Sequence, residues 1–222
     1  MSECKLCGKK GLFVSVNSFG LCSNCAPRVA IDVQQRVRII IDCLRLISES
    51  KNLETRISRC DILIQHATAL KQYEDKGIST LENNILPSKL IERYSNTKDT
   101  LILEALNDEF EQLVAKSEII KSISTIINNA SKILLKVNEM KKQLNNKDKL
   151  NEVEEKVKKF VHDKKVNSYL EAARKADFKG QKAKAIDQYK EALYFIKNDN
   201  IDDSLQANEL AEVEKKIEEL SK

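Results

Sequence analysis

Residues that break secondary structure are scarce in this sequence of 222 residues, which has five glycines and two prolines. Three of the glycines, Gly8, Gly11 and Gly20, fall within the first twenty residues. The rest of the chain therefore has few turn residues, which argues against many short strands and favours long helices. Hydrophobic residues make up 41% of the sequence, enough for a core and against wholesale disorder.

Membrane spans and catalytic motifs are also missing. No apolar run approaches the ~20 residues that cross a bilayer, and the segment before Cys4 lacks the apolar stretch of a signal peptide. The sequence has no glycine-rich phosphate loop, no HExxH motif and no dinucleotide-binding turn. Its two histidines, His66 and His162, stand in helical surroundings, where we expect them to be ordinary helix residues. We therefore predict a cytoplasmic protein with no catalytic activity and no membrane partner.

The chain as a whole has no large excess of positive or negative charge. Lys and Arg number 38 against 34 Asp and Glu, and four thiolates holding one Zn²⁺ would lower this small positive balance further. Residues 132–165 hold eleven lysines against six acidic residues, while residues 198–222 hold eight acidic residues against three lysines. We interpret these segments as solvated helix faces that balance each other, within one chain or between copies. Phosphate binding by the basic segment is the alternative.

What the sequence does have is a pattern of cysteines near its start. Cys4 and Cys7 form one CxxC pair, and Cys22 and Cys25 form a second pair fourteen residues later. Zinc takes four such ligands in a tetrahedron, and a set of four thiolates leaves no open position for chemistry. The alternative is a pair of redox dithiols, but the surrounding βαβ pattern of thioredoxin-like proteins is missing. We predict one structural Zn²⁺ bound by these four residues.

The segment between the two pairs alternates in hydrophobicity. Residues 12–16 read as a short strand, residues 17–20 as a turn, and Leu21 as the start of a return strand. Gly8 follows the first pair, where a tight turn commonly needs a positive φ. A knuckle, a hairpin and a second knuckle that leads into a helix resemble the treble-clef class of zinc fingers, with plain zinc-ribbon geometry as the alternative. We expect Phe13 and Phe19 to form the small core of this module.

The same module carries the alternative functional hypothesis. Four basic residues surround the cysteines: Lys5, Lys9, Lys10 and Arg28. With Phe13 and Phe19 free to stack on bases, they would make a nucleic-acid-binding surface. The patch is thin, and the metal-bound thiolates would offset part of its charge.

Helical periodicity begins directly after the cysteines. We predict a zinc finger over residues 1–27 and a helical hairpin over residues 28–76, with Asn52 or Ser50 capping its second helix and Gly77 ending it. Cys43 and Cys60 lie on or beside the apolar faces of this hairpin, so we expect them to be small core residues. A loop follows over residues 78–86.

One long helix or coiled-coil region is predicted over residues 87–146. Pro87 marks its start, with Ser88 as the N-cap, and residues 145–148 mark its end. Its apolar residues repeat at three and four positions from Ile102 onward, on a slightly shifted face after Ile123. We expect this stripe to be buried by self-association, or within the chain against residues 28–76.

The last domain, residues 148–222, carries a second pattern of small and aromatic residues: Ala173, Gly180, Ala185, Ile186, Tyr189, Ala192 and Leu193. This pattern resembles a tetratricopeptide repeat, although the family's first aromatic is matched only loosely by Tyr169 and its terminal proline is missing. Alanines let two helices approach closely, Gly180 makes the turn and Tyr189 fills the groove between the helices. A generic three-helix bundle, closed by a third helix over residues 210–220, is the alternative.

Together these patterns predict a mostly α-helical protein with a small N-terminal Cys4 zinc finger. The tetratricopeptide resemblance implies a concave groove for peptides or protein segments. We therefore expect a non-enzymatic adaptor or scaffold with a protein partner, and nucleic-acid binding is the alternative.

Overall fold

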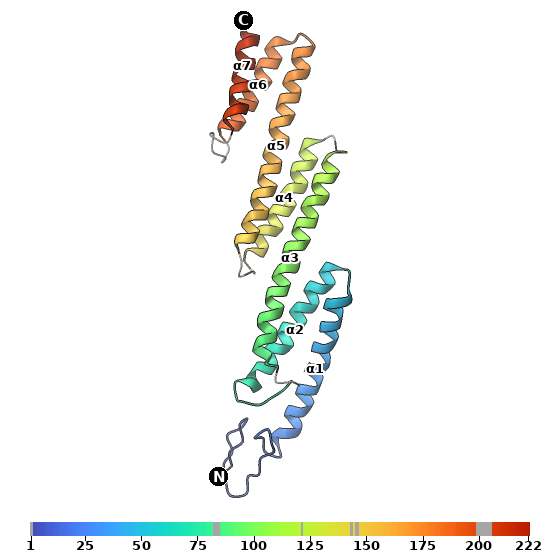
Figure 1. The fold of residues 1–222 in the computed structure, drawn as a ribbon, viewed down its shortest axis with the longest axis vertical. Helices are drawn as coiled ribbons and strands as arrows, with labels where there is room; N and C mark the ends of the chain where they lie inside the picture. The colour runs from blue at the N-terminus through green and yellow to red at the C-terminus, as the bar shows by residue number, and fades with distance from the viewer. Residues whose placement is uncertain (1, 82–84, 121, 143, 145–146, 199–205) are drawn as a thin grey trace. The chain divides into compact units, whose positions relative to one another are not determined.

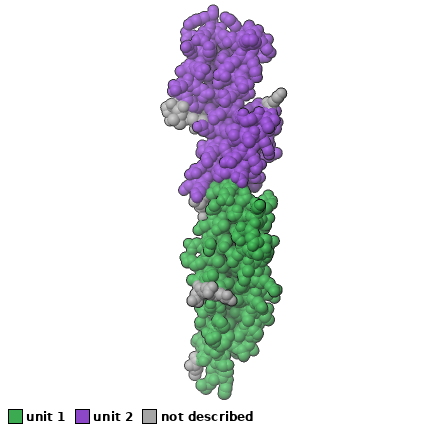
Figure 2. All heavy atoms as spheres, turned by 45° about the vertical axis from the view of Figure 1, so that its right-hand side comes forward, with its two compact units in different colours: residues 1–105 green, residues 106–222 purple. Residues whose placement is uncertain are grey.

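The computed structural model describes residues 2–81, 85–120, 122–142, 144, 147–198 and 206–222. They form seven α-helices, shown in Figure 1: α1 (Cys25–Glu49), α2 (Leu53–Glu74), α3 (Pro87–Ser117), α4 (Ile123–Met140), α5 (Asp148–Phe178), α6 (Lys182–Lys197) and α7 (Ala207–Ser221). The predicted mostly helical class is confirmed. The chain divides into two compact units, Met1–Ala105 and Leu106–Lys222, with the boundary inside α3 (Figure 2).

In the first unit, α1 and α2 form the predicted antiparallel hairpin (Figure 1). The Asn52 side chain caps α2 by accepting a hydrogen bond from the backbone N–H of Thr55, as expected for an N-cap residue. At the other end of α2, Ile78 N–H donates to the Tyr73 carbonyl and Gly77 N–H to the Glu74 carbonyl. This is a Schellman motif with Gly77 at C′ and φ +65°, so the predicted cap and stop are both confirmed.

One apolar core joins the cysteine module to the helices of the first unit. Its buried members come from the module, from α1, from α2 and the turn after it, and from the first half of α3: Cys4, Leu21, Cys22, Val29, Ile40, Cys43, Ile47, Cys60, Leu63, Ala67, Leu70, Tyr73, Ile78, Leu90 and Leu101. Cys43 and Cys60 are fully buried, which confirms their predicted place in the core. Burial raises the pKa of the Cys60 thiol to about 11 and also raises the pKa of Cys43, so both stay protonated and inert.

The beginning of α3 differs from the prediction in one residue. Pro87 is the first helical residue, a position that suits proline because its missing N–H would have no partner there. The prediction that Ser88 is the N-cap is wrong, since Ser88 lies inside the first turn. Its backbone N–H and its hydroxyl both donate to the Glu74 carboxylate, at 2.8 and 2.5 Å. Residues 82–84 of the predicted preceding loop lie outside the described residues.

The long helix or coiled-coil region predicted over residues 87–146 contains two helices in the structure. Helix α3 ends at Ser117, and α4 begins at Ile123 with Ser122 as its N-cap, whose side chain accepts from the N–H of Thr125. The Ser117 hydroxyl donates to the Val114 carbonyl, the local bond by which serine competes with the helix ladder. The α3 stripe is covered within the chain, with Leu101, Ile102, Leu106 and Leu113 all buried.

In the second unit, α5 packs against both α4 and α6, and α6 packs against α7. Helix α4 ends at Met140 and α5 begins at Asp148, so the predicted break is present, although Asn145 and Asn146 lie outside the described residues. Gly180, with φ +69°, turns the chain between α5 and α6. The core of this three-helix end contains Val166, Leu170, Ala173, Tyr189, Ala192, Ile196 and Val213.

Candidate metal centre and helical groove

Two tight turns place the four cysteines of the N-terminal module. In the first turn, Gly8 N–H donates to the Cys4 carbonyl at 2.8 Å, and Gly8 has the predicted positive φ of 70°. In the second, Ala26 N–H donates to the Cys22 carbonyl at 2.9 Å, and Cys25 is already the first residue of α1. One pair is thus fixed by a knuckle and the other by the start of a helix.

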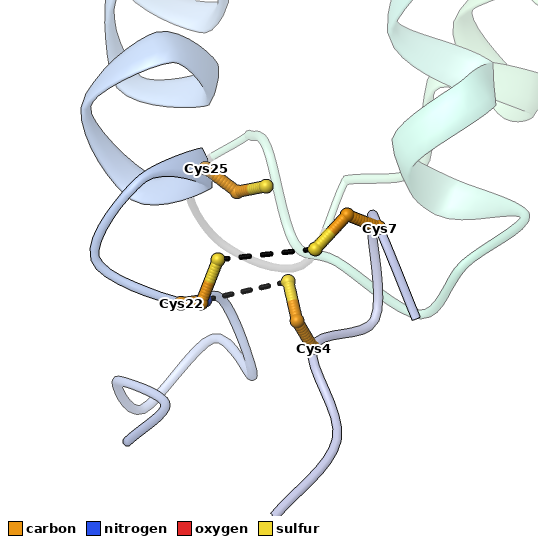
Figure 3. A group of neighbouring side chains, drawn as sticks. All are labelled: Cys4, Cys7, Cys22 and Cys25. Atoms are coloured by element: carbon orange, nitrogen blue, oxygen red, sulfur yellow. Dashed lines mark hydrogen bonds between the residues drawn. The ribbon is translucent and has the colours of Figure 1, made fainter. Parts of the chain in front are cut away.

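The four thiols converge on one point. Their Sγ atoms all lie within 4.8 Å of one another, and Figure 3 shows the side chains pointing toward a common centre. The Sγ atoms of Cys7 and Cys22 are 3.9 Å apart. A tetrahedral ion with metal–sulfur bonds of ~2.3 Å needs edges of about 3.8 Å, so the spacing fits a metal ion. The four predicted ligands are therefore brought together in a site that can hold one.

The pKa values of three of the four cysteines are consistent with a site for a cation. Hydrogen bonds from backbone N–H groups, that of Cys7 first and that of Cys22 next, lower the pKa of Cys4 to about 6. The N–H of Cys25 is the main cause of a lowered pKa at Cys22. The pKa of Cys25 is instead raised to about 12, mainly by its hydrogen bond with the Cys22 sulfur. Once one cysteine has ionised, its negative charge makes ionisation of the neighbouring cysteines less favourable. A bound cation would offset this repulsion between thiolates.

The short β-hairpin expected between the two pairs does not form as strands. The described part of the module has two isolated antiparallel bridges, Glu3 with Lys10 and Val16 with Cys22, and no strand. The predicted turn at residues 17–20 is present, because Gly20 N–H donates to the Asn17 carbonyl at 2.9 Å. The Asn17 side-chain oxygen also accepts from Phe19 N–H and Leu21 N–H. Side-chain bonds of this kind hold the segment in place of a strand ladder.

The expectation that Phe13 and Phe19 form the core of the module is wrong. The exposed fraction of the Phe13 side chain is 100%, that of Leu12 is 85% and that of Phe19 is 52%. The module is instead organised around its buried Cys4 and Cys22 and the buried Leu21, which pack against the helical hairpin. Its large apolar side chains consequently face solvent.

The four predicted basic residues have different surroundings. Lys5 donates from Nζ to the Gly77 carbonyl at 2.7 Å, and its aliphatic stem lies beside Gly20, where a Cβ would meet Lys5 Cδ at 2.8 Å. Lys10 forms an ion pair with Glu3 at 3.0 Å. Lys9 and Arg28 are exposed. Two of the four cations thus have partners within the chain, and one of these, Lys5, links the module to the turn at the end of α2.

A groove runs along the three-helix end of the second unit. One face of α5 and one face of α7 form its walls, and Tyr189 of α6 lies between them. Its volume is about 630 Å³, and its lining consists of Asn167, Leu170, Arg174, Asp177, Phe178, Tyr189, Asn208, Glu209, Glu212, Val213 and Lys216. We call it the α5–α7 groove. Apolar, amide and charged groups are mixed in it.

Comparison of the chain with models of protein families, with curated protein sequences and with solved structures finds no match. The geometry of the metal centre and of the groove therefore carries the functional argument. Among the described residues, no helix has the length and apolar character needed to cross a membrane.

A polar pocket beside the metal centre was not predicted from the sequence. It has a volume of about 510 Å³ and lies between the module, α1 and α2, with Cys7, Cys25 and Arg28 in its wall. Asp32 accepts from Arg36 Nε and from the Tyr73 hydroxyl, both at 2.9 Å. Burial alone would raise the pKa of Asp32, but these two donors outweigh it and lower the pKa. Tyr73 lies 41 residues from Asp32 in the sequence, so this contact leaves no local sequence signal.

Neither histidine belongs to the group of metal-ligating side chains found among the described residues. His66 Nδ1 lies 3.5 Å from Arg36 Nη1. The His162 ring is buried and stacks on Phe195 with the ring centroids 5.5 Å apart. Both are packed helix residues, as expected.

Proposed function

We propose that this chain is a non-catalytic scaffold, held together at its N-terminal module by one structural Zn²⁺, that binds a protein segment in its α5–α7 groove. The observation that carries the proposal is the groove itself. It is flanked by two helices, floored by a packed tyrosine and lined by amide and charged side chains.

Zinc is the ion that suits the cysteine site best. A set of four sulfur ligands at tetrahedral spacing is typical of structural zinc, whereas calcium and magnesium require oxygen ligands. The site supplies four thiols within 4.8 Å of one another, which fill the coordination sphere and leave no position for a reacting water. Zinc would hold the module folded, because a segment of this size has almost no core of its own.

The helical hairpin of α5 and α6 supports the binding role. Ala173, Ala185 and Ala192 are fully buried, and Tyr189 packs among them. Small residues at these positions allow the two helices to lie close together, in keeping with the resemblance to a tetratricopeptide repeat. Helix α7 packs on α6 and completes the second wall of the groove.

Co-purification from a lysate of the native host, with and without nuclease, tests this function. Wild type is compared with Glu212→Lys, which reverses a charge inside the groove, and with Glu218→Lys, which makes the same change elsewhere on α7. We expect a protein partner that survives nuclease, is lost with Glu212→Lys and is retained with Glu218→Lys. Recovery of nucleic acid alone would contradict the proposal.

Nucleic-acid binding by the module is the second candidate, favoured by one observation. Phe13 is fully exposed and follows Lys9 and Lys10 closely in the chain, so an aromatic ring is available for base stacking beside positive charge. Against it, Lys5 and Lys10 are engaged within the protein. A steep loss of affinity for single-stranded oligonucleotides with rising salt, abolished by Phe13→Ala, would favour this candidate.

A further inference from the structure

Among the described residues of the first unit, the two most exposed apolar side chains are adjacent and lie in a turn of the cysteine module. Leu12 is 85% exposed and Phe13 is 100% exposed. They occupy the two central positions of a turn that Val14 N–H closes on the Gly11 carbonyl at 3.2 Å. We call residues 11–14 the fingertip. Single exposed apolar residues are ordinary on a protein surface, but two adjacent ones at a turn apex form a compact anchor.

Both sides of the fingertip are held in place. Before it, Lys10 bridges to Glu3 in antiparallel fashion. After it, Val14 and Val16 pack against the core that contains the metal-site cysteines. The turn is therefore displayed on a fixed base, and docking it would cost little conformational entropy. This is the arrangement of a binding anchor rather than of a loose loop.

The α5–α7 groove has the complementary chemistry. Its apolar lining consists of Phe178, which is 94% exposed, and of the buried side chains Leu170, Tyr189 and Val213, whose outer edges reach it. Its volume of about 630 Å³ falls in the usual range of roughly 300–1,000 Å³ for sites that enclose a small set of side chains. Two large side chains fit in such a space.

Charge points to the same pairing. The groove carries three carboxylates against two cations, and one of those cations, Lys216, is paired with Glu219 at 2.8 Å. Helix α7 as a whole has five glutamates and two lysines. The fingertip is preceded by Lys9 and Lys10, with Glu3 as the nearest acidic residue in sequence. Because Lys10 is paired with Glu3, Lys9 is the cation of the tip that matches the acidic wall of the groove.

We propose that the fingertip of one copy of this chain docks into the α5–α7 groove of a second copy, with Leu12 and Phe13 inside the groove and Lys9 facing the carboxylates of α7. The proposal rests on the proposed function of the groove and names the protein segment that it takes. The interface is heterologous, since each copy contributes a different surface. Copies therefore join head to tail, in an open chain or a closed ring.

Sedimentation velocity of the zinc-loaded chain of 222 residues over a concentration series, after nuclease treatment, tests the proposal. We expect wild type to self-associate and Phe13→Asp and Glu212→Lys each to weaken this association at least about tenfold, the effect of losing a central anchor. Ile41→Asp, at another exposed apolar position, and Glu218→Lys, on another face of α7, are the matched controls and should leave association unchanged. All four substituted side chains are exposed, so the variants are expected to fold.

A mixing experiment gives the sharpest outcome. Phe13→Asp keeps an intact groove, and Glu212→Lys keeps an intact fingertip. At a protein concentration where wild type associates but each variant alone is monomeric, an equimolar mixture of the two should form a 1:1 dimer that does not grow, because its two remaining surfaces are both defective. A monomeric wild type, association insensitive to Phe13→Asp, or a mixture that stays monomeric would overturn the proposal. Association that nuclease abolishes, or fingertip-dependent binding to anionic vesicles without self-association, would overturn it as well.

The sedimentation and co-purification experiments together distinguish failure of this proposal from failure of the proposed function of the groove. If the chain does not self-associate, but a foreign protein partner is still lost with Glu212→Lys and retained with Phe13→Asp, the groove function stands and only its occupant is wrong. If neither self-association nor partner capture depends on Glu212, both proposals fail together.

Discussion

At the scale of single residues, the most specific prediction concerns the four cysteines whose thiols converge. Their Sγ atoms lie within 4.8 Å of one another, so replacing any one removes a quarter of the ligand set. We expect Cys22→Ser to weaken zinc binding by more than about 100-fold, because even the loss of outer-shell partners costs 10–100-fold. Metal content after purification, measured by plasma mass spectrometry, checks this. Cys60→Ala is the control: it also removes a buried thiol, and it should retain one zinc per chain.

Proton release on metal binding provides a second residue-scale prediction. At neutral pH the metal-free protein has Cys4, with a pKa of about 6, mostly ionised and Cys25, with a pKa of about 12, protonated. Zinc binding must therefore displace the proton of Cys25, whereas Cys4 has already lost most of its proton. Fewer than four protons are released in total. Below pH 6 Cys4 also becomes protonated, so the number released rises and the apparent affinity falls more steeply. Titration calorimetry in buffers of different ionisation enthalpy measures this number, and a value of four at neutral pH would contradict the prediction.

The four metal ligands could be predicted because the spacing of the two CxxC pairs indicates them. The prediction that Phe13 and Phe19 are buried failed because residue type does not determine exposure. In a module of this size a metal ion takes over the role of a core, so large apolar side chains are not forced inward. The contact of Asp32 with Tyr73 was missed for another reason. It joins positions 41 residues apart, and only the packing of α1 on α2 brings them together.

At the scale of helices, glycine C-caps were predictable and an internal break was not. Gly77 and Gly180 each have a positive φ at a helix end, and each is the only glycine in its region, so the signal was clear. Between α3 and α4 there is no glycine or proline. Two features of the sequence did indicate this break. The apolar face shifts after Ile123, and Ser122 is a residue type that often caps a helix, although its role as an N-cap was not predicted.

The turn between α5 and α6 supplies an element-scale prediction. Gly180 has φ +69°, and a Cβ added there would meet nothing within 4 Å, so Gly180→Ala introduces backbone strain without a steric clash. We expect a loss of about 1 kcal/mol in the free energy of unfolding, the net of left-handed strain and reduced unfolded-state entropy. Urea unfolding followed by circular dichroism measures it. Gly180→Asn should cost less, because asparagine tolerates this conformation, and an equal loss for both variants would count against strain as the cause.

At the scale of the whole molecule, the sequence suggested an independent finger, whereas the structure joins the finger to the helical hairpin by a common core. Cys4, Leu21 and Cys22 are buried in the same cluster as Val29 and Leu70. Lys5 and Lys76 also cross from one part to the other, donating to the Gly77 and Leu6 carbonyls. Removing the metal should therefore affect more than the first 25 residues.

Chelation of zinc, followed by hydrogen exchange, tests how far that effect extends. Cys25 is the first residue of α1, and the core of the first unit contains two of the metal ligands, so loss of the metal removes packing from α1 and from the end of α2. We expect amide protection to fall in residues 4–48 and 66–78, and to remain unchanged in α5, α6 and α7, whose core is separate. The Cys22→Ser variant should give the same pattern without chelator, which controls for effects of the chelator itself. Protection lost only in residues 4–25 would show that the hairpin is stable without the finger. Protection lost equally in α5–α7 would show instead that the two units unfold as one.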